Sequence, residues 1–226
     1  MEENKIKLWY WEFHGRAEAI RMLFHHKGVQ FEDFTATMDD WINGGVQAEM
    51  LMGKMPRLDI DGKKLYQSIA ILRYLGRKYG YYPDDIDQQF KVDMICDSIA
   101  DYRDGFSPYT TAQTNKDKNE ALKKFTGEHT KKFLKFYNDI LKENESWSYI
   151  VGNSLSIADF MVLIVTHTYL THEFYKDLFG DILSEYPELK KYTSERVSEL
   201  KEYYENRADY PITFLAQTKL EMLEEE

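Results

Sequence analysis

The chain is poor in cysteine and in long apolar runs, and each shortage excludes a class of protein. Cys96 is the one cysteine among 226 residues, which excludes an internal disulfide framework and a cysteine-rich metal site. Its neighbours Ile95 and Ile99 indicate a packed thiol rather than a nucleophile. The longest apolar run, residues 160–165, is far shorter than the roughly 20 residues that span a bilayer.

Positive charge is also scarce. The formal net charge is −10 and the sequence pI is about 5.2, so a nucleic-acid partner and an anionic membrane surface are not expected. The N-terminal residues MEEN are charged and do not form the apolar segment of a secretory signal. We therefore expect a cytoplasmic protein.

The usual signatures of metal and phosphate chemistry are missing as well. The six histidines have no metal-ligand spacing, and no glycine-rich phosphate loop or Gly-x-Ser-x-Gly elbow occurs. We expect no metal site and no cofactor.

The first 80 residues alternate between strand and helix signals. Residues 6–11 alternate as in a strand, residues 16–27 have a helical apolar face that ends before Gly28, and residues 29–34 form a second short strand. Residues 39–50 are interrupted by two glycines and are expected to be irregular or weakly helical. Residues 55–60 and 63–66 flank an Asp-Gly pair, the signature of a hairpin with a type I′ turn, and residues 68–79 predict a helix that stops at Gly80.

The character changes after a turn-rich stretch at residues 81–85. Amphipathic segments occupy residues 87–112, 117–143, 156–172 and 188–205, and none of them predicts a strand. Ser156 and Asp159 have the spacing of a capping box at a helix start. The fold class is therefore an α/β domain followed by an all-α domain, with expected bounds 1–82 and 87–226.

Three features of the first domain could carry a ligand, and each has an ordinary structural explanation. Tyr10 ends the first strand, where α/β folds place ligands, but it could equally be a core aromatic residue. Ser68 could hold a carboxylate at a helix N-terminus or simply cap the helix. A cis peptide bond before Pro56 would turn the Met55 backbone toward a peptide-like ligand, whereas an edge-strand proline needs no ligand.

Taken in order, the motifs resemble the cytosolic glutathione transferases. The similarity is carried by residues 7–11 (KLWYW), 15–21 (GRAEAIR), 54–62 (KMPRLDIDG), 67–75 (QSIAILRYL) and 151–160 (VGNSLSIADF). Residues 92–97 and 217–220 look most like the sigma class. The resemblance implies a thioredoxin-like N-terminal domain, a helical second domain, a homodimer, and glutathione as cosubstrate.

The resemblance also assigns roles to individual residues. Tyr10 matches the catalytic tyrosine that holds the thiol as a thiolate, and Asp101 matches an acidic residue that reaches the partner subunit's site. The remaining glutathione contacts would be Arg16, Trp41, Lys54, Met55, Pro56, Gln67 and Ser68. We expect the apolar pocket for the electrophile to use Trp11, Phe13, Tyr102, Phe106 and Tyr109.

Two departures from the sigma pattern bear on function. Ile42 and Gly45 stand where a proline and a lysine are usual, which removes one cationic contact to glutathione. Residues 101–109 do not match the electrophile pocket of the prostaglandin D synthases.

The sequence favours transfer of aryl or alkyl groups to glutathione, or peroxide reduction by the same thiolate. The alternatives are a non-catalytic hydrophobic-ligand carrier, a structural protein of the crystallin kind, and a prostaglandin isomerase.

Overall fold

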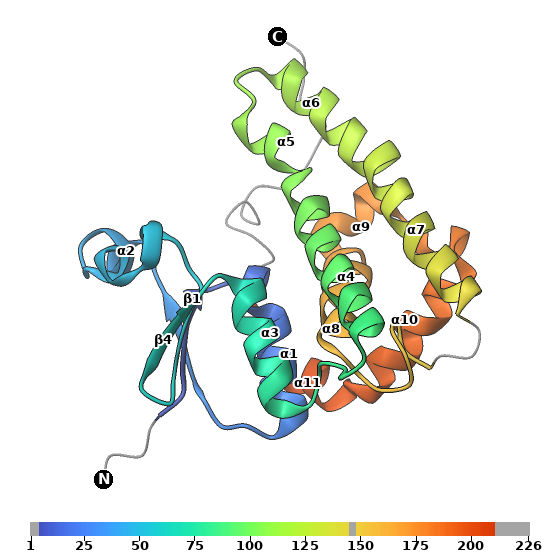
Figure 1. Ribbon diagram of the computed structural model, residues 1–226. Coiled ribbons are helices and arrows are strands. Elements are labelled where there is room, and N and C mark those ends of the chain that lie inside the picture. The colour runs from blue at the N-terminus through green and yellow to red at the C-terminus, as the bar shows by residue number, and fades with distance from the viewer. Residues whose placement is uncertain (1–4, 145–147, 211–226) are drawn as a thin grey trace. The chain divides into compact units, whose positions relative to one another are not determined.

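The computed structural model describes residues 5–144 and 148–210, so the sigma-like segment 217–220 lies outside the described residues. Contacts divide these residues into two compact units (Figure 1). The first unit comprises residues 5–83 and 200–210, and the second comprises residues 84–199. The domain bounds expected from the sequence stay a prediction. None of the described helices combines the length and the apolar composition that crossing a membrane requires.

The first unit is built on a four-stranded mixed sheet. Its strands are β1 (Lys7–Trp11), β2 (Glu32–Ala36), β3 (Arg57–Ile60) and β4 (Lys63–Tyr66), in the order β2-β1-β3-β4. The pair β1–β2 is parallel, and therefore needs a crossover, which is supplied by the 3-10 turn η1 (Gly15–Ala17) and helix α1 (Glu18–Lys27). Helix α3 (Ser68–Tyr79) packs against α1 on one face of the sheet (Figure 1). This is the α/β domain that the sequence pattern predicts, in the thioredoxin-like arrangement that the resemblance implies.

The local signals in this unit predict its turns well. Asp61 and Gly62 have φ of 50° and 72°, as both central residues of a type I′ hairpin require. The predicted helix over residues 68–79 is confirmed with the same bounds, and Gly80 ends it with φ of 85°. Helix α2 (Met38–Ile42), with 3-10 turns η2 (Val46–Glu49) and η3 (Leu51–Gly53), occupies the segment expected to be irregular or weakly helical.

The second strand is displaced from its predicted position. We expected residues 29–34, and the strand covers Glu32–Ala36. Gly28 ends α1 in the left-handed conformation, and the Val29 amide then donates to the Phe24 carbonyl. These residues close the helix end, so the strand begins where Glu32 can pair with Lys7.

The second unit is entirely helical within its described residues, as predicted. Its elements are α4 (Ile86–Asp104), α5 (Ser107–Thr111), α6 (Asn115–Lys124), η4 (Phe125–His129), α7 (Thr130–Glu143), α8 (Ile157–Leu163), η5 (Ile164–Tyr169), α9 (Glu173–Phe179), η6 (Ile182–Glu185) and α10 (Pro187–Glu199). The stretch 87–112 divides at Gly105, whose position leaves no room for a side chain because a Cβ there would lie 2.2 Å from His129 Nε2. The stretch 188–205 divides at Leu200, and α11 (Lys201–Asn206) groups with the first unit.

The capping box at the start of α8 is present and buried. Asp159 is fully buried and accepts hydrogen bonds from the Ser156 amide at 2.7 Å and the Ser156 hydroxyl at 2.8 Å. Its other oxygen accepts from the Ile150 amide at 3.0 Å and from the Tyr192 hydroxyl at 2.5 Å. Burial raises the pKa of Asp159, and these hydrogen bonds oppose the rise. One carboxylate therefore joins the start of α8, the preceding loop and α10.

We predict that Asp159→Asn destabilises the protein by about 2–4 kcal/mol, because an amide NH₂ would face two donors in place of an acceptor. Urea unfolding measures the free energy. Asp117→Asn is the matched control, since the Asp117 carboxylate accepts a hydrogen bond from the Thr114 hydroxyl at the exposed start of α6. A loss for Asp159→Asn no larger than that of Asp117→Asn would contradict the structural role of the buried carboxylate.

Candidate functional site

Tyr10 lies next to the end of β1, and its hydroxyl meets the start of the crossover. The Arg16 amide donates a hydrogen bond of 2.7 Å to Tyr10 Oη. The Tyr10 ring meets the edge of the Phe13 ring at a centroid distance of 5.1 Å, and the whole residue is 3% exposed. Because its oxygen accepts from a backbone N–H, the hydroxyl is polarised toward donating its own proton.

Gly15 makes this approach possible. It has φ of +43°, and a Cβ built there would lie 2.5 Å from both Tyr10 Oη and Phe13 Cε2. Glycine is thus required at position 15 for two reasons: φ is positive, and the Tyr10 phenol occupies the space that a Cβ would need.

The register of the sheet brings the other predicted residues of this unit to the same edge. Trp9 of β1 is opposite Arg57 of β3, which is opposite Tyr66 of β4. These neighbouring strands are antiparallel, so the residue after Trp9, those before Arg57 and those after Tyr66 lie at one edge. That edge therefore gathers Tyr10, the Met55–Pro56 pair and Gln67–Ser68.

Each member of this edge has its own backbone geometry. The peptide bond between Met55 and Pro56 is cis, and Lys54 before it is exposed. Gln67 has φ of 69°, and Ser68 is the first residue of the twelve-residue helix α3. An unpaired helix start presents backbone N–H groups, which suit a carboxylate.

Trp41 joins the same unit through Trp11, the residue after Tyr10. The two indole rings lie 4.8 Å apart between centroids, and Trp41 belongs to α2, whose start is fixed by the Thr37–Asp40 capping box.

The remaining predicted residues belong to the helical unit. Asp101 is exposed on α4, and Tyr102 beside it is buried among aromatic rings. The Tyr102 hydroxyl is bonded to Thr130 Oγ1 at 3.1 Å, and burial raises the pKa of Tyr102. Phe106 and Tyr109 stack on each other with ring centroids 5.1 Å apart. Tyr102 thus packs in the core of its unit, whereas Tyr109 keeps a partly exposed ring.

One charged residue near Tyr10 is absent from the candidates named from the sequence. Arg21 is 4% exposed and donates from Nη1 to the carbonyls of Phe13 and His14 at 3.0 and 3.3 Å. The sequence contains a signal for this residue. Arg21 follows Ala17 by four residues, and positions four apart share a helix face, so Arg21 lies on the apolar face predicted for residues 16–27.

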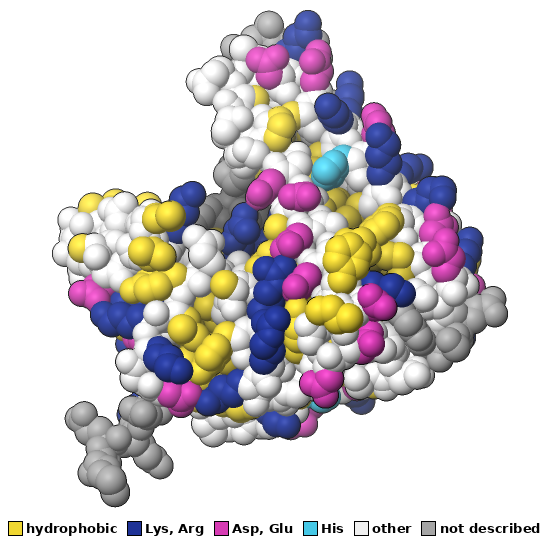
Figure 2. Space-filling model, viewed as in Figure 1, with side chains coloured by type: hydrophobic (Ala, Val, Ile, Leu, Met, Phe, Trp, Pro, Cys, Tyr) yellow, Lys and Arg dark blue, Asp and Glu magenta, His cyan; other side chains and the backbone are white. Residues whose placement is uncertain are grey.

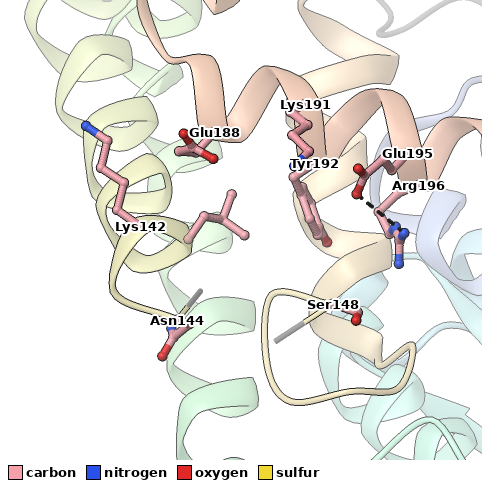
Figure 3. Close-up of a pocket in the computed structure, with 9 residues that line it drawn as sticks. Lys142, Asn144, Ser148, Glu188, Lys191, Tyr192, Glu195 and Arg196 are labelled. Carbon is pink, nitrogen blue, oxygen red and sulfur yellow. Dashed lines mark ion pairs between the residues drawn. The ribbon is translucent and has the colours of Figure 1, made fainter. Parts of the chain in front are cut away.

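A hollow lies in the helical unit, lined by residues of α7, of α10 and of the stretch before α8 (Figure 3). It measures about 570 Å³, and the predicted site residues are not among those that line it. Arg196 forms ion pairs there with Glu195 and Glu199 at 3.8 and 3.2 Å and lies over the Tyr149 ring. Lys142, Glu188 and Lys191 also line this hollow, so its lining is mostly charged and polar. In the described part of the chain, no group of three or more His, Cys, Asp or Glu side chains is arranged to hold a metal ion.

The comparisons with known proteins agree over most of the chain. Residues 4–77 match the family profile "Glutathione S-transferase, N-terminal domain", and residues 100–207 match "Glutathione S-transferase, C-terminal domain". The chain is 33% identical over 212 residues to glutathione S-transferase 1 of Ascaris suum, covering 92% of this chain and 98% of the relative. It is 32% identical over 200 residues to glutathione S-transferase 3 of Caenorhabditis elegans, covering 84% and 96%.

Solved structures of similar proteins have the same fold. The fold is similar to prostaglandin synthase D of Nilaparvata lugens, with a TM-score of 0.77, 26% identity and coverage of 90% of this chain and 98% of the other. It is also similar to a monomeric glutathione S-transferase of the hookworm Necator americanus, with a TM-score of 0.71, 29% identity and coverage of 91% and 98%.

We predict that Gly15→Ala costs more stability than Gly28→Ala. Both positions have positive φ, which costs an alanine about 1–2 kcal/mol. At Gly28 a Cβ would meet nothing within 4 Å, whereas at Gly15 it would meet Tyr10 and Phe13. Overpacking adds about 1–3 kcal/mol, which urea unfolding of the two variants would detect. Equal losses would contradict the close packing described around Tyr10.

Proposed function

This chain belongs to the glutathione S-transferase family and is a glutathione transferase; from that premise we propose that Tyr10 holds the bound thiol as a thiolate for addition to small hydrophobic electrophiles. The observation that carries the proposal is the hydrogen bond from the Arg16 amide to Tyr10 Oη, 2.7 Å long. This bond takes up one acceptor site of the phenol oxygen, and we infer that the phenol donates its proton to the sulfur when glutathione binds.

The magnitude of this effect is sufficient. A free cysteinyl thiol has a pKa near 8.5, so only a few per cent is ionised at neutral pH. A hydrogen bond to a charged acceptor is worth about 1.5–3 kcal/mol, which corresponds to roughly 1–2 pKa units. Tyr10 then stays protonated and donates, and the thiolate attacks the electrophilic carbon as the leaving group departs.

Access to the hydroxyl sets a condition on binding. Tyr10 is 3% exposed, and the Phe13 ring and Gly15 lie against it. We infer that the sulfur approaches past the partly exposed Phe13 ring, which has to turn aside when glutathione binds.

The same sheet edge supports the proposed contacts to the tripeptide. The Met55 backbone would pair with the cysteinyl unit beside Pro56, and Gln67 and Ser68 would hold the γ-glutamyl carboxylate at the start of α3. Lys54 is exposed and would reach the glycyl carboxylate, with Trp41 along the tripeptide. Arg16 lies at the start of the crossover, where its charge would add to the positive electrostatic potential around the thiolate.

The residues proposed from the sequence to meet the electrophile are aromatic in each unit. Trp11 and Phe13 follow Tyr10 in the first unit, while Phe106 and Tyr109 present stacked rings in the second. Tyr102 is packed in the core of the second unit. The pocket would be aromatic, which suits aryl and alkyl electrophiles.

The class and the isomerase alternative remain proposals. Residues 92–97 and the similarity to prostaglandin synthase D of Nilaparvata lugens favour the sigma class, while residues 101–109 depart from the synthase pattern. We therefore propose conjugation as the main activity and isomerisation as the second candidate. Product analysis with an aryl halide and with a prostaglandin endoperoxide separates them. We also propose a cytoplasmic location and a role in detoxification.

We predict that Tyr10→Phe lowers kcat/KM for an aryl halide roughly 10- to 150-fold at neutral pH, as a loss of about 1.5–3 kcal/mol implies. The affinity for glutathione, measured by calorimetry, should change less. Tyr79→Phe is the matched control, because Tyr79 ends α3 away from this edge. An unchanged rate in Tyr10→Phe would refute the role of the phenol.

We also propose a homodimer, and the support is the exposed face of α4. Ile86, Phe90 and Met94 follow one another at intervals of four residues and are 72%, 68% and 36% exposed. Asp101 continues the same face, seven residues after Met94. Figure 2 shows hydrophobic side chains gathered where α4 and α7 run, and Phe136 of α7 is 41% exposed. Such a patch marks an interaction site, here for a second copy whose site Asp101 would reach.

We predict that Phe90→Lys converts a dimer to monomers at micromolar concentration in sedimentation velocity runs, because a charge would enter an apolar interface. Ile42→Lys is the control, since Ile42 is 66% exposed on α2 and lies off the α4 face. A wild-type chain that is monomeric and fully active would contradict the proposal that Asp101 reaches the site of a second copy.

A further inference from the structure

The buried guanidinium of Arg21 joins the strand beside Tyr10 to the loop that follows it. Arg21 Nε donates to Asp33 Oδ2 at 2.8 Å, and Nη2 donates to Asp33 Oδ1 at 3.2 Å. This two-point pair fixes the plane of the guanidinium against β2. Burial would lower the pKa of Arg21, but the charge and hydrogen bonds of Asp33 raise it above its ordinary value, so the side chain stays charged.

The third guanidinium nitrogen, Nη1, binds the loop whose backbone amide donates a hydrogen bond to Tyr10. Nη1 donates to the carbonyls of Phe13 and His14 at 3.0 and 3.3 Å. The next two residues are Gly15 and Arg16, whose amide donates to Tyr10 Oη. The Arg21 guanidinium carbon also lies 5.7 Å from the centre of the Tyr10 ring. One side chain therefore restrains both partners of that hydrogen bond.

The charges around Arg21 are balanced within one cluster, in which Arg21 faces Asp33 and, at 3.9 Å, Glu18. Geometry is therefore the main contribution of Arg21. Asp33 balances Arg21, and Glu18 accepts from Arg207 at 2.6 Å and contacts His14 Nδ1 at 2.8 Å. Burial would raise the pKa of Glu18, but His14, Arg207 and Arg21 together lower it to about 2. The other titratable groups that line the small cavity here are His25, Tyr203 and Tyr210. Asp33 is the carboxylate among the lining residues of this cavity, and it is paired with Arg21.

We propose that Arg21 is a positioning residue that sets the Arg16 amide on the Tyr10 hydroxyl and, through it, the acidity of the bound glutathione thiol. The proposal rests on the proposed function and extends it. A lysine could keep the charge beside Asp33, but it cannot hold Asp33 at two points and two carbonyls at once. Arg21→Lys thus separates geometry from charge.

The test follows the pH dependence of kcat/KM for an aryl halide together with the ultraviolet absorbance of thiolate in the glutathione complex. For Arg21→Lys we expect both midpoints to rise by about one pH unit, as the misalignment of one hydrogen bond implies. Arg57→Lys is the matched control, because Arg57 is 3% exposed in the same unit and pairs with Asp59 at 2.8 Å on β3 rather than with this loop. Its midpoints should stay at the wild-type value.

A second variant guards against a failure of Arg21→Lys to fold. Asp33→Asn keeps Arg21 but removes one of its two acceptors, and a smaller rise in both midpoints is expected. Unchanged midpoints in a folded Arg21→Lys or Asp33→Asn protein would overturn the positioning role. If Tyr10→Phe also leaves the midpoints unchanged, the proposed function itself fails, and the two failures are thereby distinguished.

Discussion

The hydrogen bond from the Arg16 amide to the Tyr10 hydroxyl joins the end of a strand to the start of the crossover, and the proposed chemistry depends on it. Its length of 2.7 Å requires a residue without a side chain at position 15. A phenol oxygen that already accepts from a backbone amide can direct its proton elsewhere, and a thiolate is the acceptor that gains most from it. Backbone amides move little once the fold is made, so such a donor is preorganised.

The sheet topology places the rest of the proposed glutathione site. A mixed order of β2-β1-β3-β4, in which β3 and β4 run antiparallel to their neighbours, brings the end of β1, the start of β3 and the end of β4 to one edge. A peptide ligand at that edge could meet backbone at Met55, a helix start at Ser68 and the phenol of Tyr10. The proposed site is thus a consequence of strand register, and no single motif creates it.

The sequence predicts best where local rules decide the structure. The hairpin at Asp61–Gly62 and helix α3 follow from turn chemistry and apolar periodicity, and both appear as expected. Strand β2 was misplaced by about two residues, because the end of α1 uses the residues after Gly28. Helix α9 (Glu173–Phe179) was missed. The apolar helix face signals that Arg21 is buried, but its contacts could not be predicted, since they involve Asp33 twelve residues away and two backbone carbonyls. Among the named candidates, Tyr102 illustrates the other limit: an aromatic residue on an amphipathic helix can face the core as readily as a pocket.

The central claim is that the bound sulfur is an anion at neutral pH because of one phenolic donor. The most direct measurement is a spectrophotometric titration of the thiol in the complex of the wild-type protein with glutathione. The account predicts an apparent pKa about 1–2 units below the value of the free thiol, near 8.5. A complex that forms with an unshifted thiol pKa would contradict it.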